Sequence, residues 1–228
     1  MIEIEKRVAE VRRRIDSAAE RVNANGSQIL LVAVGKTVAP EIVARAASSG
    51  LCHLGENYAQ ELRDKLAFFE RTGAHADWHF VGRLQKNKVK YVVGNCRLIH
   101  SVDSAALASE IDKRAENSGV EAQILIEINQ DSPSKGGVSP DNARDLFEFT
   151  DGLENVRARG LMTMPPYSSD PEVSRRYFRE LRELRDEIAP DFPDASELSM
   201  GMSADFETAV EEGATIVRVG SLIFGERN

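Results

Sequence analysis

Hydrophobic positions recur every three or four residues near the start of the chain, with charged residues between them. This spacing is that of an α-helix with one buried face. It predicts an amphipathic helix over residues 4–22, ended by the turn-forming pair Asn25-Gly26. The apolar positions of the stripe are Ile4, Val8, Val11, Ile15 and Val22.

From residue 29 onward the pattern becomes an alternation of short apolar runs and longer amphipathic segments. Each apolar run is followed by a polar turn, which is typical of a buried strand that leads into a helix. Pro40 begins the first of these predicted helices and Gly50 ends it. The predicted strands are ILLVAVGK, CHLGEN, WHFVG, RLIHSVD, AQILIEIN, VRARGLMTMPP, ELSMGM and TIVRVGSLIFG.

Repeated strand–helix units predict a parallel β-sheet that is covered by helices. Eight such units in roughly 200 residues match the size of a small (β/α)₈ barrel. An open doubly wound sheet is the alternative, but the chain lacks the G-x-G-x-x-G turn that is typical of dinucleotide-binding folds of that kind. We therefore expect one domain over residues 1–228, with a leading helix (residues 1–25) packed on the barrel.

One lysine, Lys36, lies at the end of the first apolar run, ILLVAVGKT. Burial disfavours the charged ammonium and lowers the pKa of a lysine, so that its amine can form a Schiff base with an aldehyde. A lysine that only marks where the strand reaches water is the simpler interpretation of this residue alone. The other strand ends favour the nucleophile, because active sites of (β/α)₈ barrels lie at the carboxyl ends of the strands.

The predicted ends of the seventh and eighth strands carry residues suited to binding a phosphate. Gly201 and Gly220 permit close approach of the backbone, and the hydroxyl groups of Ser203 and Ser221 can donate hydrogen bonds. Loops at these two places commonly bind phosphates in such barrels. Ser203 also fits the N-cap of the following helix, with Asp205 in its first turn.

Arg218 interrupts the apolar pattern of the eighth predicted strand. Strands one and eight are neighbours in a closed barrel, so Lys36 and Arg218 are expected to reach the same small ligand. An ion pair between Arg218 and a carboxylate such as Glu56 is the structural alternative. A lysine amine beside a phosphate site predicts a ligand with an aldehyde and a phosphate, either pyridoxal 5′-phosphate (PLP) or a phosphorylated sugar bound by an aldolase-type lysine.

Composition argues against several other functions. The net charge of −8 disfavours nucleic-acid binding, so the basic residues between positions 83 and 90 are interpreted as a solvated helix face. The four histidines show no metal-ligand spacing, and no metal site is expected. The start MIEIEKR is unlike a signal peptide and no run is long enough to span a membrane, which predicts a cytoplasmic protein. Cys52 and Cys96 are expected to be reduced thiols that fill core positions.

Six motifs follow one another along the chain: VGKT, LGENYAQEL, WHFVGRLQKNK, IHSVDS, GLMTMPP and ELSMGMSADFETAVEEGATIVRVGSLIFG. In this combination the chain resembles the pyridoxal phosphate homeostasis proteins (the YggS/PROSC family) over essentially its whole length. The resemblance implies a single (β/α)₈ TIM barrel, the fold-type III PLP barrel of the alanine racemase N-terminal domain. It also implies an extra N-terminal helix and no C-terminal β domain.

The resemblance assigns roles to residues at the predicted strand ends. Lys36 corresponds to the lysine that holds PLP as a Schiff base, and Arg218 to the arginine that faces the pyridine nitrogen. Asn57 corresponds to an asparagine near the cofactor, whereas His79 and Arg83 belong to the same region without an assigned role. The positions that correspond to phosphate-binding residues are Met202, Ser203, Gly220 and Ser221.

The sequence departs from the family pattern at three places, none of them assigned to the cofactor. Gly35 stands where many relatives have serine, and Leu54 where many have phenylalanine. The loop SPSKGG (residues 132–137) has an extra glycine. These departures concern loop geometry rather than binding.

Two functions fit the resemblance. The first is a non-catalytic protein that holds PLP on Lys36 and takes part in intracellular PLP (vitamin B6) homeostasis as a monomer or weak homodimer, with PLP-dependent apo-enzymes as recipients. The alternative is a racemase-like PLP-dependent enzyme acting on amino acids. Similar racemases use a tyrosine supplied with a second domain, whereas Tyr58 and Tyr167 are interpreted here as packing or loop residues. The carrier is therefore favoured, and no catalytic residue is assigned.

Overall fold

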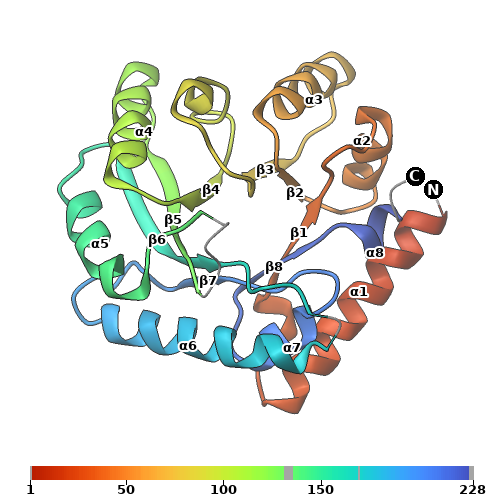
Figure 1. Ribbon diagram of the computed structural model, residues 1–228. Helices are drawn as coiled ribbons and strands as arrows, with labels where there is room; N and C mark the ends of the chain where they lie inside the picture. Colours follow the sequence, from red (N-terminus) through yellow and green to blue (C-terminus); the bar gives the residue numbers. More distant parts are fainter. Residues whose placement is uncertain (1, 131–135, 169, 226–228) are drawn as a thin grey trace.

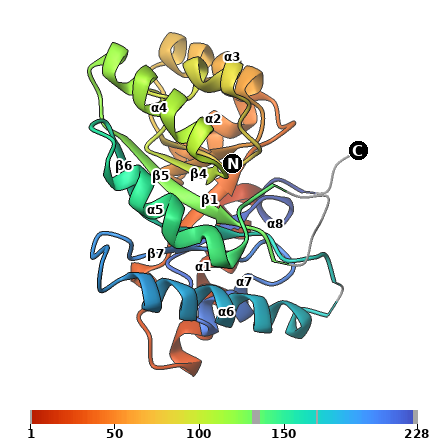
Figure 2. The same ribbon diagram turned by 60° about the vertical axis from the view of Figure 1, so that its left-hand side comes forward.

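Eight parallel strands form a closed barrel in the order β1-β2-β3-β4-β5-β6-β7-β8, with helices around its outside (Figure 1; Figure 2). The computed structural model describes residues 2–130, 136–168 and 170–225. The predicted (β/α)₈ barrel is confirmed, and the open doubly wound sheet is wrong. The strands are β1 (Leu30–Val34), β2 (His53–Glu56), β3 (Asp77–Phe80), β4 (Leu98–Val102), β5 (Ala122–Ile128), β6 (Val156–Thr163), β7 (Glu197–Ser199) and β8 (Ile216–Val219).

Helical segments follow the strands in the order that the sequence predicts. The short piece after β3 is a 3₁₀-helix rather than an α-helix. The α-helices are α1 (Ile2–Arg21), α2 (Pro40–Ser48), α3 (Ala59–Thr72), α4 (Ala105–Ser118), α5 (Ala143–Asp151), α6 (Glu172–Ile188), α7 (Phe206–Glu211) and α8 (Ser221–Phe224). The 3₁₀-helices are η1 (Gly26–Gln28), η2 (Lys86–Tyr91) and η3 (Pro140–Asn142).

The leading helix α1 packs beside α7 and α8 on the outside of the barrel (Figure 1). Val11 and Ile15 of its apolar stripe are buried in the main core and Ile4 and Val8 are partly buried against it, whereas Val22 follows the end of the helix and is exposed. A half-buried ion pair joins it to α7, in which Arg14 Nη2 lies 2.6 Å from Glu207 Oε2. The helix ends at Arg21, before the predicted turn at Asn25-Gly26. The residue that takes the left-handed conformation after it is Asn23, with φ 54°.

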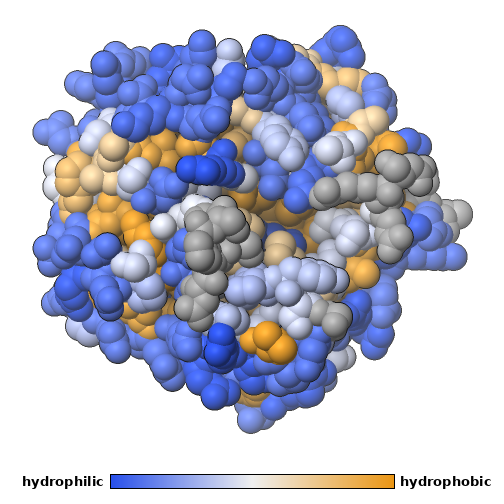
Figure 3. Space-filling model, in the orientation of Figure 1, coloured by the Kyte–Doolittle hydropathy of each residue, from blue (hydrophilic) through white to orange (hydrophobic). Residues whose placement is uncertain are grey.

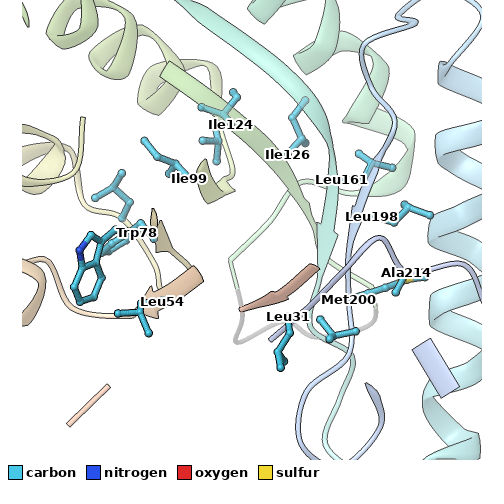
Figure 4. Close-up of a cluster of buried hydrophobic side chains, with 14 of the residues drawn as sticks. Leu31, Leu54, Trp78, Ile99, Ile124, Ile126, Leu161, Leu198, Met200 and Ala214 are labelled. Atoms are coloured by element: carbon cyan, nitrogen blue, oxygen red, sulfur yellow. The ribbon is translucent and has the colours of Figure 1, made fainter. Parts of the chain in front are cut away.

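Side chains alternate along each strand, so one set faces the helices and the other faces the inside of the barrel. The outward-facing side chains pack against the helices and form the main hydrophobic core, part of which Figure 4 shows. The inward set includes a smaller apolar cluster contributed by five strands, which fills part of the barrel interior. Its buried members are Val32, Leu98, Leu125, Met162 and Ile216.

The surface is largely hydrophilic around the periphery of the face seen in Figure 3, with apolar residues visible between the polar ones. Among the helices of the described residues, none combines the length and apolar character needed to cross a membrane.

We expect Gly160→Ala to destabilise the barrel where β6 pairs with β7. Gly160 has φ +149°, and a Cβ there would lie 2.0 Å from the carbonyl oxygen of Glu197. Backbone strain and overpacking should together lower the free energy of unfolding by about 2–4 kcal/mol, measured by urea denaturation. Gly152→Ala is the control, because Gly152 has φ −76° and its nearest neighbour would be 3.5 Å away. Equal stability of the two variants would contradict this strand contact.

Candidate functional site

Lys36 lies in the turn after β1, two residues beyond the last strand residue, Val34. Its side chain is half-buried. Strand β1 pairs in parallel with β8, and the register places Val32 opposite Arg218. The carboxyl ends of the first and last strands therefore lie side by side, as closure of the barrel predicts.

A buried ion pair holds the backbone next to Lys36. The Lys65 ammonium on α3 donates to the carbonyl oxygen of Gly35 at 2.7 Å and to the carboxylate of Glu56. Lys65 and Glu56 are 2% and 0% exposed. Burial raises the pKa of Glu56, and the adjacent Lys65 ammonium acts against this shift. Lys65 thus links the Lys36 turn to the end of β2, a role that sequence reasoning missed.

The other side of the same turn is held by α3 as well. The N–H of Thr37 donates to Glu61 Oε2 at 2.7 Å, and Thr37 has a left-handed φ of 64°. Glu61 Oε2 also lies 3.4 Å from Lys65 Nζ. The residues on both sides of Lys36 are therefore bonded to one helix, which fixes the course of the turn.

Arg218 points into the barrel and is 4% exposed. Its Nη1 donates to Ser199 Oγ at 2.5 Å, and its Nη2 donates to the carbonyl oxygen of Thr163 at 2.9 Å. Burial lowers the pKa of Arg218 to about 10, which still leaves the guanidinium protonated at neutral pH. The alternative ion pair with Glu56 is wrong, because that carboxylate is bonded to Lys65.

The loops after β7 and β8 contact each other at the predicted phosphate site. The backbone N–H of Gly220 donates to Ser203 Oγ at 3.4 Å. Ser203 is not the N-cap of α7; that position belongs to Asp205, whose Oδ1 accepts from the N–H of Met202 at 2.8 Å. Met202 and Ser221 are exposed. The structure thus brings together all four residues for which a phosphate-binding role is predicted.

Asn57 follows β2 directly, and its side-chain oxygen is buried without a hydrogen-bond partner among the described residues. The Asn57 backbone is fixed by Gly82, where a Cβ would lie 2.2 Å from the Asn57 carbonyl oxygen. Gly82 is held in turn by Ser101, whose Oγ donates to its carbonyl oxygen at 2.5 Å. Buried polar atoms are normally hydrogen-bonded, so an unsatisfied amide oxygen at a strand end fits a ligand site.

His79 and Arg83 are separated by the structure. His79 is buried inside the barrel with its Nε2 3.1 Å from His53 Nδ1 and its Nδ1 3.0 Å from His100 Nε2. His79 is therefore a hydrogen-bonded histidine of the barrel interior. Arg83 is exposed and lines a surface cavity of about 400 Å³ together with Asn57 and other residues after β2 and β3.

The remaining sequence predictions have mixed outcomes. No cluster of His, Cys, Asp and Glu suited to a metal ion occurs in the part of the chain that the structure describes. Cys96 is half-buried, but Cys52 is exposed and does not fill the core. In the loop SPSKGG, residues 132–135 lie outside the described residues, which resume at Gly136. Tyr58 and Tyr167 are 54% and 88% exposed.

Comparison with known proteins identifies the family. A family model described as the N-terminal domain of alanine racemase matches residues 7–228. The pyridoxal phosphate homeostasis protein of Aquifex aeolicus is 48% identical over 224 residues, which are 97% of each chain. The chain belongs to the pyridoxal phosphate homeostasis protein family. The resemblance inferred from the six motifs is therefore confirmed.

Two solved structures are similar to this member of the pyridoxal phosphate homeostasis protein family. PipY of Synechococcus elongatus, solved with PLP bound, has a TM-score of 0.85 and 32% identity, covering 97% of this chain and all of its own. An unknown protein from Bifidobacterium adolescentis has a TM-score of 0.91 and 35% identity, covering 97% of this chain and 94% of its own. The barrel is thus shared over nearly full length.

We expect Lys65→Met to lower the free energy of unfolding by about 3–5 kcal/mol, because it leaves the buried Glu56 carboxylate uncompensated. Adding Glu56→Gln should recover part of this loss by removing the charge. Urea denaturation measures both effects. Lys113→Met, at an exposed position on α4, is the control and should change stability by about 0.5 kcal/mol or less. If Lys65→Met lowered the free energy of unfolding no more than the control does, the claim that this ion pair stabilises the fold would be wrong.

Acid should destabilise the protein through His79. Burial lowers its pKa from 6.5 to about 3, so the unfolded chain binds more protons than the folded one between these values. Stability present above pH 6.5 is then lost as the pH falls toward 3. Denaturation curves at several pH values should show a shallower pH dependence for His79→Gln than for the wild type. His75→Gln, at an exposed position, should keep the wild-type slope.

Proposed function

We propose that this protein binds PLP as a Schiff base on Lys36, without catalytic turnover, and takes part in intracellular PLP homeostasis. One arrangement carries the proposal: the turn with Lys36 lies where β1 pairs with β8, beside the strand that bears Arg218 and leads to Gly220. PipY, which is 32% identical, was solved with PLP bound. In this proposal the protein acts in the cytoplasm as a monomer or weak homodimer and supplies PLP-dependent apo-enzymes.

The residues present fit the chemistry of PLP. The Lys36 amine suits its aldehyde, with which a primary amine condenses with loss of water. The Ser203 hydroxyl and the Gly220 N–H meet at one point and, with Ser221 and Met202, suit its phosphate. Arg218 suits the ring nitrogen, because a guanidinium donates hydrogen bonds and does not accept them. The unsatisfied oxygen of Asn57 offers a further contact to a bound ligand.

Two observations favour a carrier over an amino-acid-converting enzyme. Relatives that match over almost their whole length are named pyridoxal phosphate homeostasis proteins. Arg218 does not decide between the two functions: its guanidinium would leave the ring nitrogen unprotonated and the ring a poorer electron sink, which is compatible with racemase chemistry but does not demand it. The tyrosines near the strand ends, Tyr58 and Tyr167, are exposed rather than held inside the barrel.

We expect the purified protein with added PLP to show visible absorbance that borohydride abolishes, with the cofactor mass then fixed on the peptide that contains Lys36. Lys36→Ala should abolish the reducible adduct, since no other amine is proposed to reach the aldehyde. Lys113→Ala, at an exposed position on α4, should retain it.

The outcomes separate the parts of the proposal. An adduct of unchanged stoichiometry in Lys36→Ala would overturn the site, and no absorbance in the wild type would overturn the cofactor. Turnover of amino acids by the same PLP-loaded sample would replace the carrier by a racemase-like enzyme.

A further inference from the structure

Five hydrogen-bonded side chains cross the inside of the barrel, and we call them the barrel ladder: Arg218, Ser199, His100, His79 and His53. They come from β8, β7, β4, β3 and β2. The distances between successive atoms are 2.5 Å, 2.8 Å, 3.0 Å and 3.1 Å. The first four residues are buried, and the side chain of His53 is 19% exposed. The ladder therefore links Arg218 to a group that water reaches.

The direction of the bonds in the ladder follows from two facts: Arg218 can only donate, and the buried hydroxyl proton of Ser199 needs an acceptor. A guanidinium only donates, so Ser199 Oγ must accept from Arg218. Among the described residues, Ser199 Oγ contacts only Arg218 and His100, so its buried hydroxyl proton is hydrogen-bonded only if it is donated to His100 Nδ1, 2.8 Å away. A neutral imidazole that accepts at Nδ1 carries its proton on Nε2. His100 therefore donates from Nε2 to His79.

The same reasoning continues to the end of the ladder. His79 accepts from His100 at Nδ1 and so carries its own proton on Nε2, which it donates to His53 Nδ1. Burial lowers the pKa of His79 to about 3 and lowers that of His100 well below its usual value, so both rings are neutral near pH 7. Each inner ring thus has one proton and one acceptor, and both are used.

The residue of the ladder that accepts from Arg218 is Ser199, whose hydroxyl group is neutral, unlike a carboxylate, which would neutralise the guanidinium. The second bond of Arg218 is also to a neutral acceptor, the carbonyl oxygen of Thr163 at 2.9 Å. These two bonds come from different terminal nitrogens and so fix the plane of the guanidinium. Neither of these two hydrogen bonds is to a carboxylate; the carboxylates of Asp205 and Glu127 act on Arg218 only through the electrostatic field, which raises its pKa against the effect of burial.

We propose that Ser199, His100 and His79 are positioning residues for Arg218: a neutral, one-directional chain of hydrogen bonds that fixes the guanidinium and leaves its positive charge available to the ligand site. Arg218 in turn fixes His100 and His79 as the Nε2–H tautomer. The role toward the cofactor rests on the proposed function, whereas the tautomers are a property of the cofactor-free chain.

The first test is the tautomeric state of each histidine in the cofactor-free wild type, measured by long-range ¹H–¹⁵N correlation NMR between pH 6 and 8. His79 and His100 should each show one protonated nitrogen, Nε2, throughout this range. A proton on Nδ1 of either ring would overturn the ladder. His75, which is exposed, gives the reference signal of a solvated imidazole.

The second test removes the donor that sets the direction. In cofactor-free Arg218→Met, Ser199 Oγ loses its donor and His100 Nδ1–H can take that place, so His100 should show a mixture of both tautomers. Retention of the Nε2–H form alone would overturn the part assigned to Arg218. If this variant does not fold, the wild-type tautomers still decide whether the ladder exists.

The third test concerns the cofactor. Ser199→Ala breaks the ladder next to Arg218, so the PLP-loaded variant should shift the visible absorption maximum and release PLP about tenfold faster than the wild type. Thr150→Val is the matched control, because it removes a buried hydroxyl on α5 that bonds the Phe147 carbonyl oxygen. Wild-type release and absorbance in Ser199→Ala would overturn the positioning role.

The two proposals fail in different ways. A wild-type protein that takes up no PLP contradicts the proposed function, and the NMR tautomers then decide the ladder alone. A wild-type protein that binds PLP on Lys36 but shows Nδ1–H at His100 keeps the function and loses the ladder.

Discussion

The pairing of β1 with β8 is the constraint on which the rest of the structure depends. Residues 30–33 of β1 are in register with residues 216–219 of β8, so the contact joins segments from nearly opposite ends of the sequence. It places the turn of Lys36 beside the strand of Arg218, and α1 packs on the neighbouring α7 and α8. If the sheet kept this strand order but did not close, the two strands would lie at opposite edges, and no single ligand could reach both side chains.

The barrel and most of the site were predictable because their signals are local. Apolar runs followed by turns predict strands, and the rule that sites lie at carboxyl strand ends selects Lys36, Asn57 and Arg218. Boundaries were less predictable, since they depend on one or two residues. Asp205 takes the N-cap position predicted for Ser203. Cys52 is exposed because β2 begins one residue after it.

Individual side-chain contacts between elements were not predictable, because they depend on register and on which face each residue takes. Lys65 occupies a buried position in the apolar stripe of α3, between Leu62 and Phe69, which was a signal for a buried partner. That partner, Glu56, comes from another element and could not be named from the sequence. The same limit applies to the histidines of the barrel ladder, whose order is fixed only when β2, β3 and β4 are aligned side by side.

The closing strand pair also has a consequence for synthesis on the ribosome. Lys36 leaves the ribosome well before Arg218 and Gly220, and contacts between residues so distant in sequence form slowly. While β8 is still inside the ribosome, the emerged chain can form seven strands and many of the helices, but it lacks the pairing of β1 with β8. The cofactor site proposed here is thus assembled only when folding is complete, so occupancy of Lys36 would report a finished barrel.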